Sequence, residues 1–198
     1  MNASEPDEDA PARPASDELL PAERKVIDSL GHLPLDFRAM SAVSNLFRSS
    51  TAIRRHMEAN VLAADRLSWT AFTGLWVLWI WGEMEARDFA AAVGISRPTA
   101  TGVVTTLEGR GLVRRRRDER DGRMVLVSLT PTGRRRIEDL FPRLNAEEVA
   151  LTSSLTGAEQ ETLAGLLRSL LRAVDSTGVG GGPSGVSGTG RNTRAPSP

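Results

Sequence analysis

The sequence predicts a mainly α-helical protein with a small β-wing, and two observations predict this class. Apolar residues recur at helical spacing over most of the chain between residues 21 and 175. Within residues 86–129, two short helical patterns separated by Gly94 are followed by two apolar, β-branched runs around an arginine-rich turn. Helix, tight turn, helix and hairpin follow one another in the order of a winged helix-turn-helix lobe. The remaining helical patterns, before and after this lobe, predict an additional helical region.

The N-terminal part is expected to hold a disordered tail and two helices. Residues 1–17 are acidic, rich in proline and alanine and without periodicity, which is typical of disorder. Residues 21–30 have a short helical pattern with an apolar edge, closed by Gly31. A longer pattern runs from residue 36 to about residue 65. Its apolar positions are Met40, Val43, Phe47, Ile53, Met57 and Val61.

The next segment, residues 67–81, carries all four tryptophans of the chain. Ser68 is a suitable N-cap for a helix here. Apolar side chains recur at intervals of three and four residues at Phe72, Leu75, Trp76 and Trp79. A buried helical face explains several of these aromatic residues, so core packing is their simplest interpretation.

The helix-turn-helix is predicted from its caps. The first helix ends at Gly94, because a helix C-terminus favours a residue that can adopt a positive φ. Ser96 is a good N-cap for the second helix, and Pro98 falls in its first turn, where a missing N–H is tolerated. This second helix is expected from Arg97 to about Arg110. Its apolar stripe is Ala100, Val103, Val104 and Leu107.

The opposite side of the second helix carries groups that can read DNA. In a major groove, arginine can bind guanine, and threonine can contact a polar base edge or the thymine methyl. Arg97, Thr99, Thr101 and Thr105 are the candidates. Gly102, in the helix interior, costs about 1 kcal/mol relative to alanine. Either a close approach to DNA or close packing against a neighbouring helix would explain this glycine.

An arginine-rich hairpin follows. The runs LVRRRR and MVLVSL predict two strands, and Asp121-Gly122 is a strong turn signal between them. The four arginines at 114–117 alternate between the two faces of the first strand, so not all of them can contact DNA. Arg120 at the tip can reach a narrow minor groove, where negative potential attracts a guanidinium. Asp118 is expected to pair with an arginine and fix the shape of the wing. The arginines that can meet phosphates are Arg115, Arg116, Arg117 and Arg123.

Five short motifs occur in a set order between residues 87 and 136. They read Asp88-Phe89-Ala90, Gly94-Ile95-Ser96, Leu107 to Val113, Asp118 to Arg123, and Leu129 to Arg134. Each fragment alone is common, whereas the ordered set at these spacings is specific. In this order they resemble the DNA-binding lobe of the MarR family of transcriptional regulators, whose pattern is D-L-A-x-x-x-G-(V/I)-S, L-E-x-R-G-L-V, D-x-R-x-x-R and L-T-x-x-G-R. The resemblance extends more loosely from about residue 41 to residue 175.

The resemblance implies a domain organisation. Residues 18–175 would form one MarR-like domain, with the winged-helix DNA-binding lobe at residues 67–131. Residues 36–66 and 132–175 would be dimerisation helices, because in this family the first helix and the last two helices of two protomers interlock. Residues 176–198 are rich in glycine, serine, threonine and proline, and we expect them to be a disordered tail.

The last predicted helix supports a dimer. Thr156 and Glu159 form a capping box at its start. Its apolar stripe is Leu163, Leu166, Leu167, Leu170 and Leu171. These leucines could instead pack within one chain. A two-fold homodimer is the preferred interpretation, since it would present two recognition helices to a palindrome.

The resemblance also implies two sets of site residues. The expected DNA contacts are Ser96, Arg97, Thr99, Thr101, Thr105, Arg115, Arg117, Arg120 and Arg123. In this family, a small aromatic or phenolic anion often binds between the helix that corresponds to residues 67–81, the first helix and the DNA-binding lobe, and lowers DNA affinity. The walls of such a site would be Arg55, His56, Trp69, Phe72 and Trp76. Phe72 stands where many members have glutamine, so no particular ligand is predicted.

The charge of the chain is balanced overall but unevenly distributed. The 198 residues include 25 basic and 25 acidic side chains, which gives a formal net charge of zero. Residues 86–136 contain twelve arginines against five acidic residues, a local excess of +7. Positive charge is thus concentrated on the lobe expected to bind double-stranded DNA.

The residue types exclude several other functions. The chain has no cysteine, so disulfides, thiolate zinc sites and cysteine-based redox sensing are excluded. His32 and His56 are the only histidines, and with no tyrosine, phosphate loop or metal-ligand cluster no enzyme site can be assembled. No metal or cofactor is therefore expected. The N-terminus lacks a signal pattern, and the longest apolar run, residues 75–81, is too short to cross a bilayer, so we expect a cytoplasmic protein without membrane contact.

Two other interpretations of residues 86–129 compete with this one. An ordinary helix pair with a solvated charged hairpin is disfavoured, because the caps, the turn and the basic hairpin agree on one module. A winged helix that binds a protein, without specific DNA readout, predicts a neutral or acidic recognition face, and the arginine hairpin argues against it. The sequence therefore predicts a sequence-specific DNA-binding transcriptional regulator. By resemblance it is a homodimeric repressor of a palindromic operator, released by a small aromatic ligand.

Overall fold

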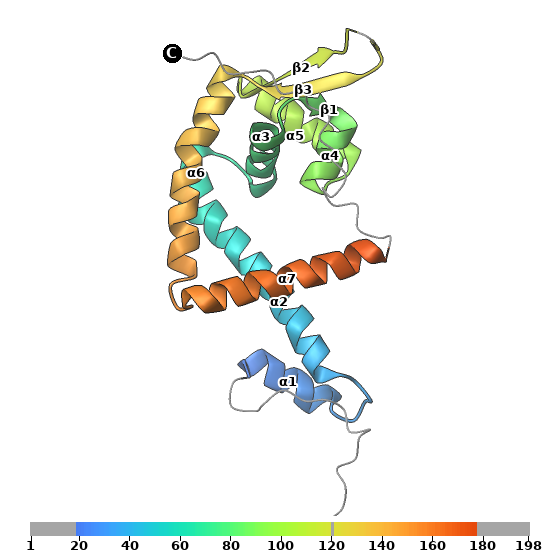
Figure 1. Ribbon diagram of the computed structural model, residues 1–198, viewed down its shortest axis with the longest axis vertical. Helices are drawn as coiled ribbons and strands as arrows, with labels where there is room; N and C mark the ends of the chain where they lie inside the picture. Colours follow the sequence, from blue (N-terminus) through green and yellow to red (C-terminus); the bar gives the residue numbers. More distant parts are fainter. Residues whose placement is uncertain (1–18, 120, 178–198) are drawn as a thin grey trace, which may run out of the picture. The chain divides into compact units, whose positions relative to one another are not determined.

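A computed structural model of the chain describes residues 19–119 and 121–177. The tail expected at residues 1–17 and nearly all of the tail expected at residues 176–198 lie outside the described residues, as does Arg120. The chain divides after His56 into two compact units. The first unit contains two helices, and the second contains the remaining helices and a small sheet (Figure 1).

The first unit consists of helix α1 (Pro21–Leu30) and nearly all of helix α2 (Phe37–Met57). α1 confirms the short helix predicted from residues 21–30. Glu23 of α1 is buried, and its carboxylate accepts a hydrogen bond from Asn45 Nδ2 of α2 at 3.0 Å. A second hydrogen bond, from the backbone N–H of Leu20 at 2.9 Å, holds the same carboxylate at the start of α1. Glu23 therefore fastens the two helices to each other.

The second unit begins where the long first helix loses its regular geometry. A π-helix over Glu58–Leu62 and a 3-10 turn over Ala63–Asp65 follow α2. The run ends at Arg66, which adopts a left-handed conformation with φ 52°. The predicted extent of this helical pattern is confirmed, but its last turns are irregular. Val61 and Leu62 are consecutive in the π-helix, and both are buried.

Helix α3 (Trp69–Trp81) is the centre of the second unit. Ser68 caps it as predicted, since its side chain accepts a hydrogen bond from the backbone N–H of Ala71 at 3.2 Å. Gly74 of α3 lies against the ring of Phe89, so closely that a Cβ at Gly74 would be 2.8 Å from a ring carbon. The buried residues of α3 are Ala71, Phe72, Gly74, Leu75, Val77 and Leu78.

Helices α4 (Ala86–Val93) and α5 (Arg97–Gly109) form the predicted helix-turn-helix. Gly94 ends α4 with φ 73°, and Ser96 caps α5, so both predicted signals are confirmed. Ala100, Val104 and Leu107 of α5 are buried in the core, while Val103 is partly buried and packs against it.

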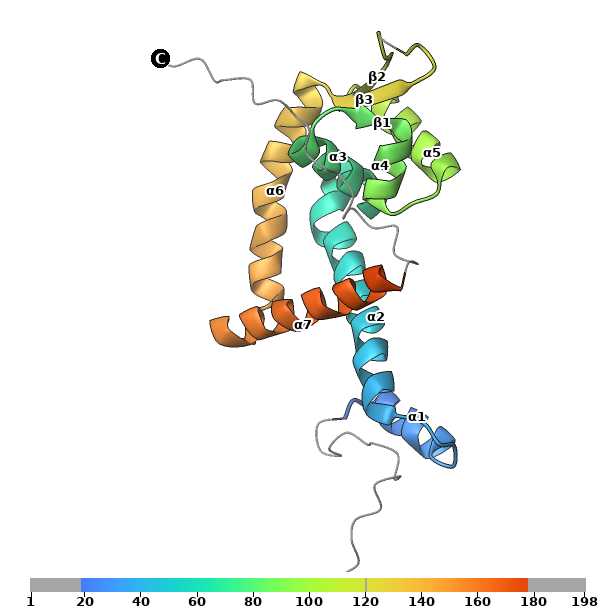
Figure 2. The ribbon, with the colours of Figure 1, turned by 45° about the vertical axis from the view of Figure 1, so that its right-hand side comes forward.

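A three-stranded antiparallel sheet completes the lobe. Its strands are β1 (Met84–Glu85), β2 (Val113–Arg117) and β3 (Val125–Leu129), in the order β1-β3-β2. The hairpin of β2 and β3 is confirmed, with Val113 opposite Leu129 and Arg117 opposite Val125. β1 was not predicted, because a two-residue strand has no periodicity to detect. The sheet lies beside the first turns of the following helix in both views (Figures 1 and 2).

Helices α6 (Pro131–Leu151) and α7 (Gly157–Ser176) end the described chain. Gly133 permits the junction between α6 and the rest of the lobe, because a Cβ there would lie 1.8 Å from the carbonyl oxygen of Leu112. α7 has the predicted capping box of Thr156 and Glu159, and none of its residues is buried. Within the two described ranges, no helix combines the length and the apolar character needed to cross a bilayer.

Candidate nucleic-acid interface

The N-terminus of α5 presents a group of exposed hydroxyls. Ser96 Oγ accepts a hydrogen bond from the backbone N–H of Thr99 at 3.3 Å, and it lies 2.8 Å from Thr99 Oγ1. Thr101 Oγ1 donates to the backbone carbonyl of Arg97 at 3.0 Å. These four side chains are exposed, and a hydroxyl that makes one such bond still has lone pairs for a further partner. The helix start therefore offers an arginine and three hydroxyls to solvent.

Gly102 lies on the same exposed side of α5. Within the described chain, nothing outside its own helix lies within 4 Å of the position that a Cβ would take. Packing against a neighbouring helix of the same chain therefore does not explain this glycine. Thr105, three residues further on, is also exposed. The surface at Gly102 is open, which is compatible with the other explanation given for this glycine, a close approach to DNA.

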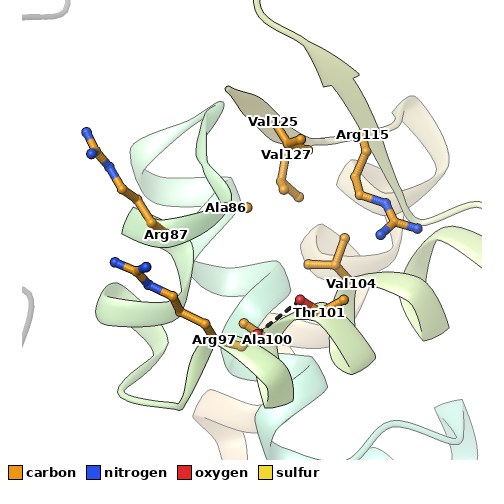
Figure 3. Close-up of a pocket in the computed structure, with 9 residues that line it drawn as sticks. All are labelled: Ala86, Arg87, Arg97, Ala100, Thr101, Val104, Arg115, Val125 and Val127. Carbon is orange, nitrogen blue, oxygen red and sulfur yellow. Dashed lines mark hydrogen bonds between the residues drawn. The ribbon is translucent and has the colours of Figure 1, made fainter. Parts of the chain in front are cut away.

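A hollow of about 350 Å³ lies between α5, the start of α4 and the sheet (Figure 3). The guanidinium groups of Arg87, Arg97 and Arg115 stand around it. Two of them are paired with carboxylates, Arg87 with Glu85 at 2.8 Å and Arg115 with Glu108 at 2.5 Å. The apolar residues that line the hollow are Ala86, Ala100, Val104, Val125 and Val127. A concave surface with cations around it suits an anionic group, such as a backbone phosphate.

One face of β2 is bound to the recognition helix. Arg115 donates from Nε to Glu108 Oε2 at 2.9 Å, and from its backbone N–H to Glu108 Oε1 at 3.0 Å. Arg115 Nη2 also bonds Oε2, so one carboxylate of α5 accepts three hydrogen bonds from this arginine. The phosphate contact expected of Arg115 would therefore have to use Nη1 or the second N–H of Nη2. Arg117, on the same face, is exposed and forms no ion pair with any other described residue.

The other face of β2 is bound to the chain before β1. Arg116 Nε donates to Glu83 Oε2 at 3.0 Å, and Arg114 Nε donates to Ser128 Oγ at 3.1 Å. The predicted alternation of the four arginines is thus confirmed. It sends Arg114 and Arg116 to neighbours on one side and Arg115 to Glu108 on the other. Only part of the local excess of positive charge is therefore available to a ligand.

The two acidic partners of the wing have lowered pKa values. The side-chain hydrogen bond from Arg116 is the main cause for Glu83, and the pKa of Arg116 is raised in return. For Glu108, the hydrogen bonds from the side chain and the backbone of Arg115 lower the pKa. Both carboxylates therefore stay ionised below the usual range of a glutamate, and both ion pairs persist in mild acid.

The wing tip, residues 118–124, is longer than the turn expected from Asp121-Gly122 alone. Asp121 begins a turn, because its carbonyl accepts a hydrogen bond from the backbone N–H of Met124 at 2.9 Å. Asp118 Oδ1 accepts a hydrogen bond from the backbone N–H of Asp121 at 3.2 Å, which anchors the loop. Arg123 is exposed at this tip. The pairing of Asp118 with an arginine stays a prediction.

The residues expected to bind a ligand fall on two helices. Trp69, Phe72 and Trp76 lie on α3 of the second unit. Phe72 is buried, and its ring centroid is 5.6 Å from that of Trp69. Trp76 contacts Trp81 edge-on at 5.3 Å. The other two expected residues, Arg55 and His56, lie near the end of α2 in the first unit.

Sequence reasoning missed several residues that shape this surface. Glu108 falls outside the predicted apolar stripe of α5, and the sequence did not identify it as the partner of β2. Glu83 carried no signal, because the strand of two residues that follows it was not predicted. Asp65 was assigned only to the end of a helix, although three arginines converge on it. The excess of arginines over acidic residues in this part of the sequence did not indicate which of these pairs would form.

Comparison with known proteins identifies the lobe. A profile of the MarR family matches residues 67–125, from the start of α3 to the start of β3. An uncharacterized HTH-type transcriptional regulator of Bacillus subtilis, YwaE, is 39% identical over 163 residues, which are 81% of this chain and 95% of that protein. The chain belongs to the MarR family. This MarR-family protein is a DNA-binding transcriptional regulator and not an enzyme.

Solved structures agree with the fold of this MarR-family regulator. AbsC, a MarR family transcriptional regulator from Streptomyces coelicolor, matches 69% of this chain and 94% of its own with a TM-score of 0.62 and 20% identity. BpsR of Bordetella bronchiseptica matches 65% of this chain and 98% of its own, with a TM-score of 0.59 and 28% identity. The DNA binding of BpsR is regulated by 6-hydroxynicotinic acid. The mainly helical fold with a small antiparallel wing sheet is confirmed.

Proposed function

We propose that this regulator binds a palindromic operator as a homodimer and represses transcription from it. The observation that carries the proposal is the exposed face of α5, where Arg97, Thr99 and Thr105 surround the open surface of Gly102. A helix in this position of a winged helix-turn-helix enters the major groove, where such side chains read base edges. A dimer bound across a promoter would exclude the polymerase, so repression is the expected outcome. Because it acts on chromosomal DNA, we expect it in the cytoplasm.

The proposed contacts divide between the two parts of the lobe. The helix supplies Ser96, Arg97, Thr99, Thr101 and Thr105 to the major groove. The wing supplies Arg117 and Arg123 to phosphates, and Arg115 through the guanidinium N–H groups that Glu108 leaves unbonded. Arg120, outside the described residues, is assigned to the minor groove at the tip. Each phosphate contact should contribute about −0.9 to the slope of log K against log salt concentration.

The homodimer is supported by apolar side chains that the single chain leaves uncovered. Leu166 and Leu171 of α7 are 61% and 65% exposed, and Phe47 of α2 is 69% exposed. Contiguous apolar faces of this kind mark an interaction surface. The other exposed apolar residues of these two helices are Val43, Leu46, Ile53, Leu163, Leu170 and Val174. A second copy is the proposed cover, since two-fold pairs are the commonest assembly and match a palindrome.

We also propose a small aromatic acid as the effector. The support is the similarity to BpsR, whose DNA binding is regulated by 6-hydroxynicotinic acid. Aromatic and cationic side chains are the groups that such an acid requires. The aromatic candidates are Trp69, Phe72 and Trp76 of α3, while Arg55 and His56 belong to the other unit and stay predictions from the sequence.

A binding experiment tests the proposal. Fluorescence anisotropy would measure the affinity of the protein for inverted repeats taken from the DNA beside its own gene, at several salt concentrations. We expect one repeat to bind well above a scrambled duplex, and 6-hydroxynicotinic acid or a related acid to weaken that binding. Arg97→Ala and Thr99→Ala should relax the base preference within each half-site, whereas Arg135→Ala, a charge loss outside the proposed interface, should not. Equal, salt-independent binding to every duplex would contradict the proposal.

A further inference from the structure

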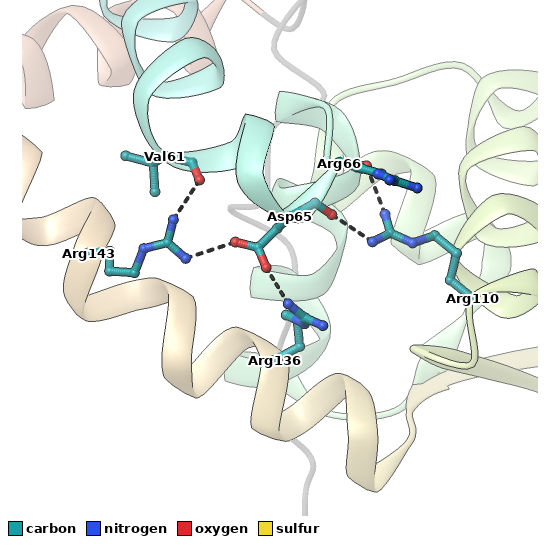
Figure 4. Close-up of polar contacts among 6 residues, drawn as sticks. All are labelled: Val61, Asp65, Arg66, Arg110, Arg136 and Arg143. Atoms are coloured by element: carbon teal, nitrogen blue, oxygen red, sulfur yellow. Dashed lines mark hydrogen bonds and ion pairs between the residues drawn. The ribbon is translucent and has the colours of Figure 1, made fainter.

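Asp65 is a buried carboxylate at the end of the first long helical run. Its side chain is 6% exposed and has arginines on both oxygens (Figure 4). Arg136 of α6 bonds Oδ1, and Arg143, two turns further along α6, donates to Oδ2 at 2.9 Å. Arg143 also donates to the backbone carbonyl of Val61 at 3.0 Å. Asp65 therefore holds α6 at two points along its length.

The backbone of Asp65 holds the recognition helix as well. Arg110, the C-cap residue of α5, donates to the carbonyl oxygens of Asp65 at 2.7 Å and Arg66 at 2.8 Å (Figure 4). These carbonyls are available because the left-handed conformation of Arg66 ends the helical run there. They form the negative end of that run, which favours a cation. One short segment thus binds α5 through its carbonyls and α6 through its carboxylate.

We propose that Asp65 is a positioning residue that sets the angle between the recognition helix α5 and α6. The start of α6 is already attached next to α5, because Thr130 Oγ1 donates to the carbonyl of Gly111 at 2.6 Å and Gly133 packs on Leu112. Further along α6, Ile137, Leu140 and Leu144 pack in the core, and apolar packing of this kind is non-directional. The bonds of Asp65 to Arg136 and Arg143 add fixed directions and distances along the same part of α6.

Directional bonds, rather than burial, give Asp65 this role. Burying the Asp65 carboxylate carries a desolvation cost that offsets much of the attraction to Arg136 and Arg143, which are themselves 46% and 48% exposed. Each of these bonds, however, requires a particular direction and distance between two helices. A set of bonds that converges from α5 and α6 on one residue therefore defines a geometry more than it adds stability.

This inference rests on the proposed dimer for its consequence. If α6 belongs to the dimerisation region, the angle between α5 and α6 determines how far apart the two recognition helices stand. Half-sites of a palindrome must match that separation to within a fraction of a helical turn of DNA. Loss of the bonds at Asp65 should then change the preferred spacing of half-sites more than the affinity for a single half-site.

The first measurement tests, in the absence of DNA, whether the angle between α5 and α6 is fixed. Because the chain has no cysteine, Thr106→Cys on α5 and Asp139→Cys on α6 give two unique sites for spin labels. Labelled chains diluted in excess unlabelled protein report only distances within one chain. We expect one narrow distance distribution for the labelled protein without further substitution, and a broadened or shifted distribution in Arg110→Ala and in Asp65→Asn. Arg135→Ala, which also removes one charge, should leave the distribution narrow. Arg110→Lys should give a distribution between that of Arg110→Ala and the narrow one.

The second measurement tests the consequence on duplexes with one half-site or with two half-sites at graded separations. Arg110→Ala should lower the ratio of best-spaced to poorly spaced affinity about fivefold, with little change on the single half-site. The inference is overturned if the distance distribution is the same in all variants, or if single and paired half-sites weaken equally. If the unsubstituted protein binds no duplex, the proposed function fails, while the distance measurement still decides the role of Asp65.

Discussion

At the scale of single residues, Glu108 joins the recognition helix to the wing. Its carboxylate accepts three hydrogen bonds from Arg115, two of them from the guanidinium. Hydrogen bonds between charged partners are stronger than neutral ones, and the paired guanidinium contacts fix the orientation of both groups. Glu83 holds Arg116 on the opposite face of the same strand. The wing is therefore held from both sides by carboxylates that can be titrated.

This arrangement predicts an acid sensitivity. The pKa values of Glu83 and Glu108 lie below the ordinary value of 4.5, so each pair stabilises the folded state fully above that pH. The stabilisation is lost as the pH falls through the lowered pKa values. Thermal unfolding measured from about pH 6 to about pH 3 should show a steeper loss for the native sequence than for the double variant Glu83→Gln, Glu108→Gln. Parallel curves would contradict the assignment.

Gly102 gives a prediction in which stability and binding move in opposite directions. Replacing a glycine in a helix interior by alanine stabilises the helix by about 1 kcal/mol, and among the residues that the structure describes no neighbouring element lies within 4 Å of the new methyl group. Gly102→Ala should therefore raise the free energy of unfolding, measured with urea, and weaken operator binding. Gly109→Ala, at the other end of α5 and equally open, should stabilise without the same loss of binding. Unchanged affinity in Gly102→Ala would remove the glycine from the interface.

At the scale of elements, the sequence predicted the ends of helices but not the pairing of residues that are distant along the chain. Ser96, Gly94 and Thr156 define helix ends through bonds to residues a few positions away, so the sequence pattern was sufficient to place them. Asp65 meets its α6 partners across 71 and 78 residues, and no periodicity encodes such a pairing. Four consecutive arginines were rightly divided between two faces by strand alternation. The partners that those arginines contact on each face became visible only in the fold.

The junction between the wing and α6 depends on Gly133. A methyl group there would lie 1.8 Å from the carbonyl oxygen of Leu112, so the start of α6 would have to move. Overpacking of this kind typically costs about 3 kcal/mol or less, and we expect Gly133→Ala to be near that limit. Urea unfolding would measure it, with Gly157→Ala at the open start of α7 as the control. A loss no larger than that of the control would mean that the junction adjusts without strain.

At the scale of the whole molecule, charge and apolar surface lie in different places. The chain as a whole is neutral, while residues 86–136 have an excess of positive charge, part of which is neutralised by internal pairs. The exposed leucines of α7, which are Leu163, Leu166, Leu170 and Leu171, lie outside residues 86–136. This separation of charged and apolar surface suits a protein that binds a polyanion through one surface and a second copy of itself through another.

The separation of the two surfaces predicts that dimerisation and contact with DNA can be broken independently. Leu166→Glu places a charge in the exposed apolar face of α7, and sedimentation velocity should then report a monomer, because burying an unpaired carboxylate in the interface is strongly unfavourable. Since the lobe itself is untouched, a single half-site should bind as before, whereas the palindrome should lose its additional affinity. Ser169→Glu adds the same charge outside the leucine stripe and should remain dimeric. A Leu166→Glu protein that stays dimeric would show that α7 is not the contact between copies.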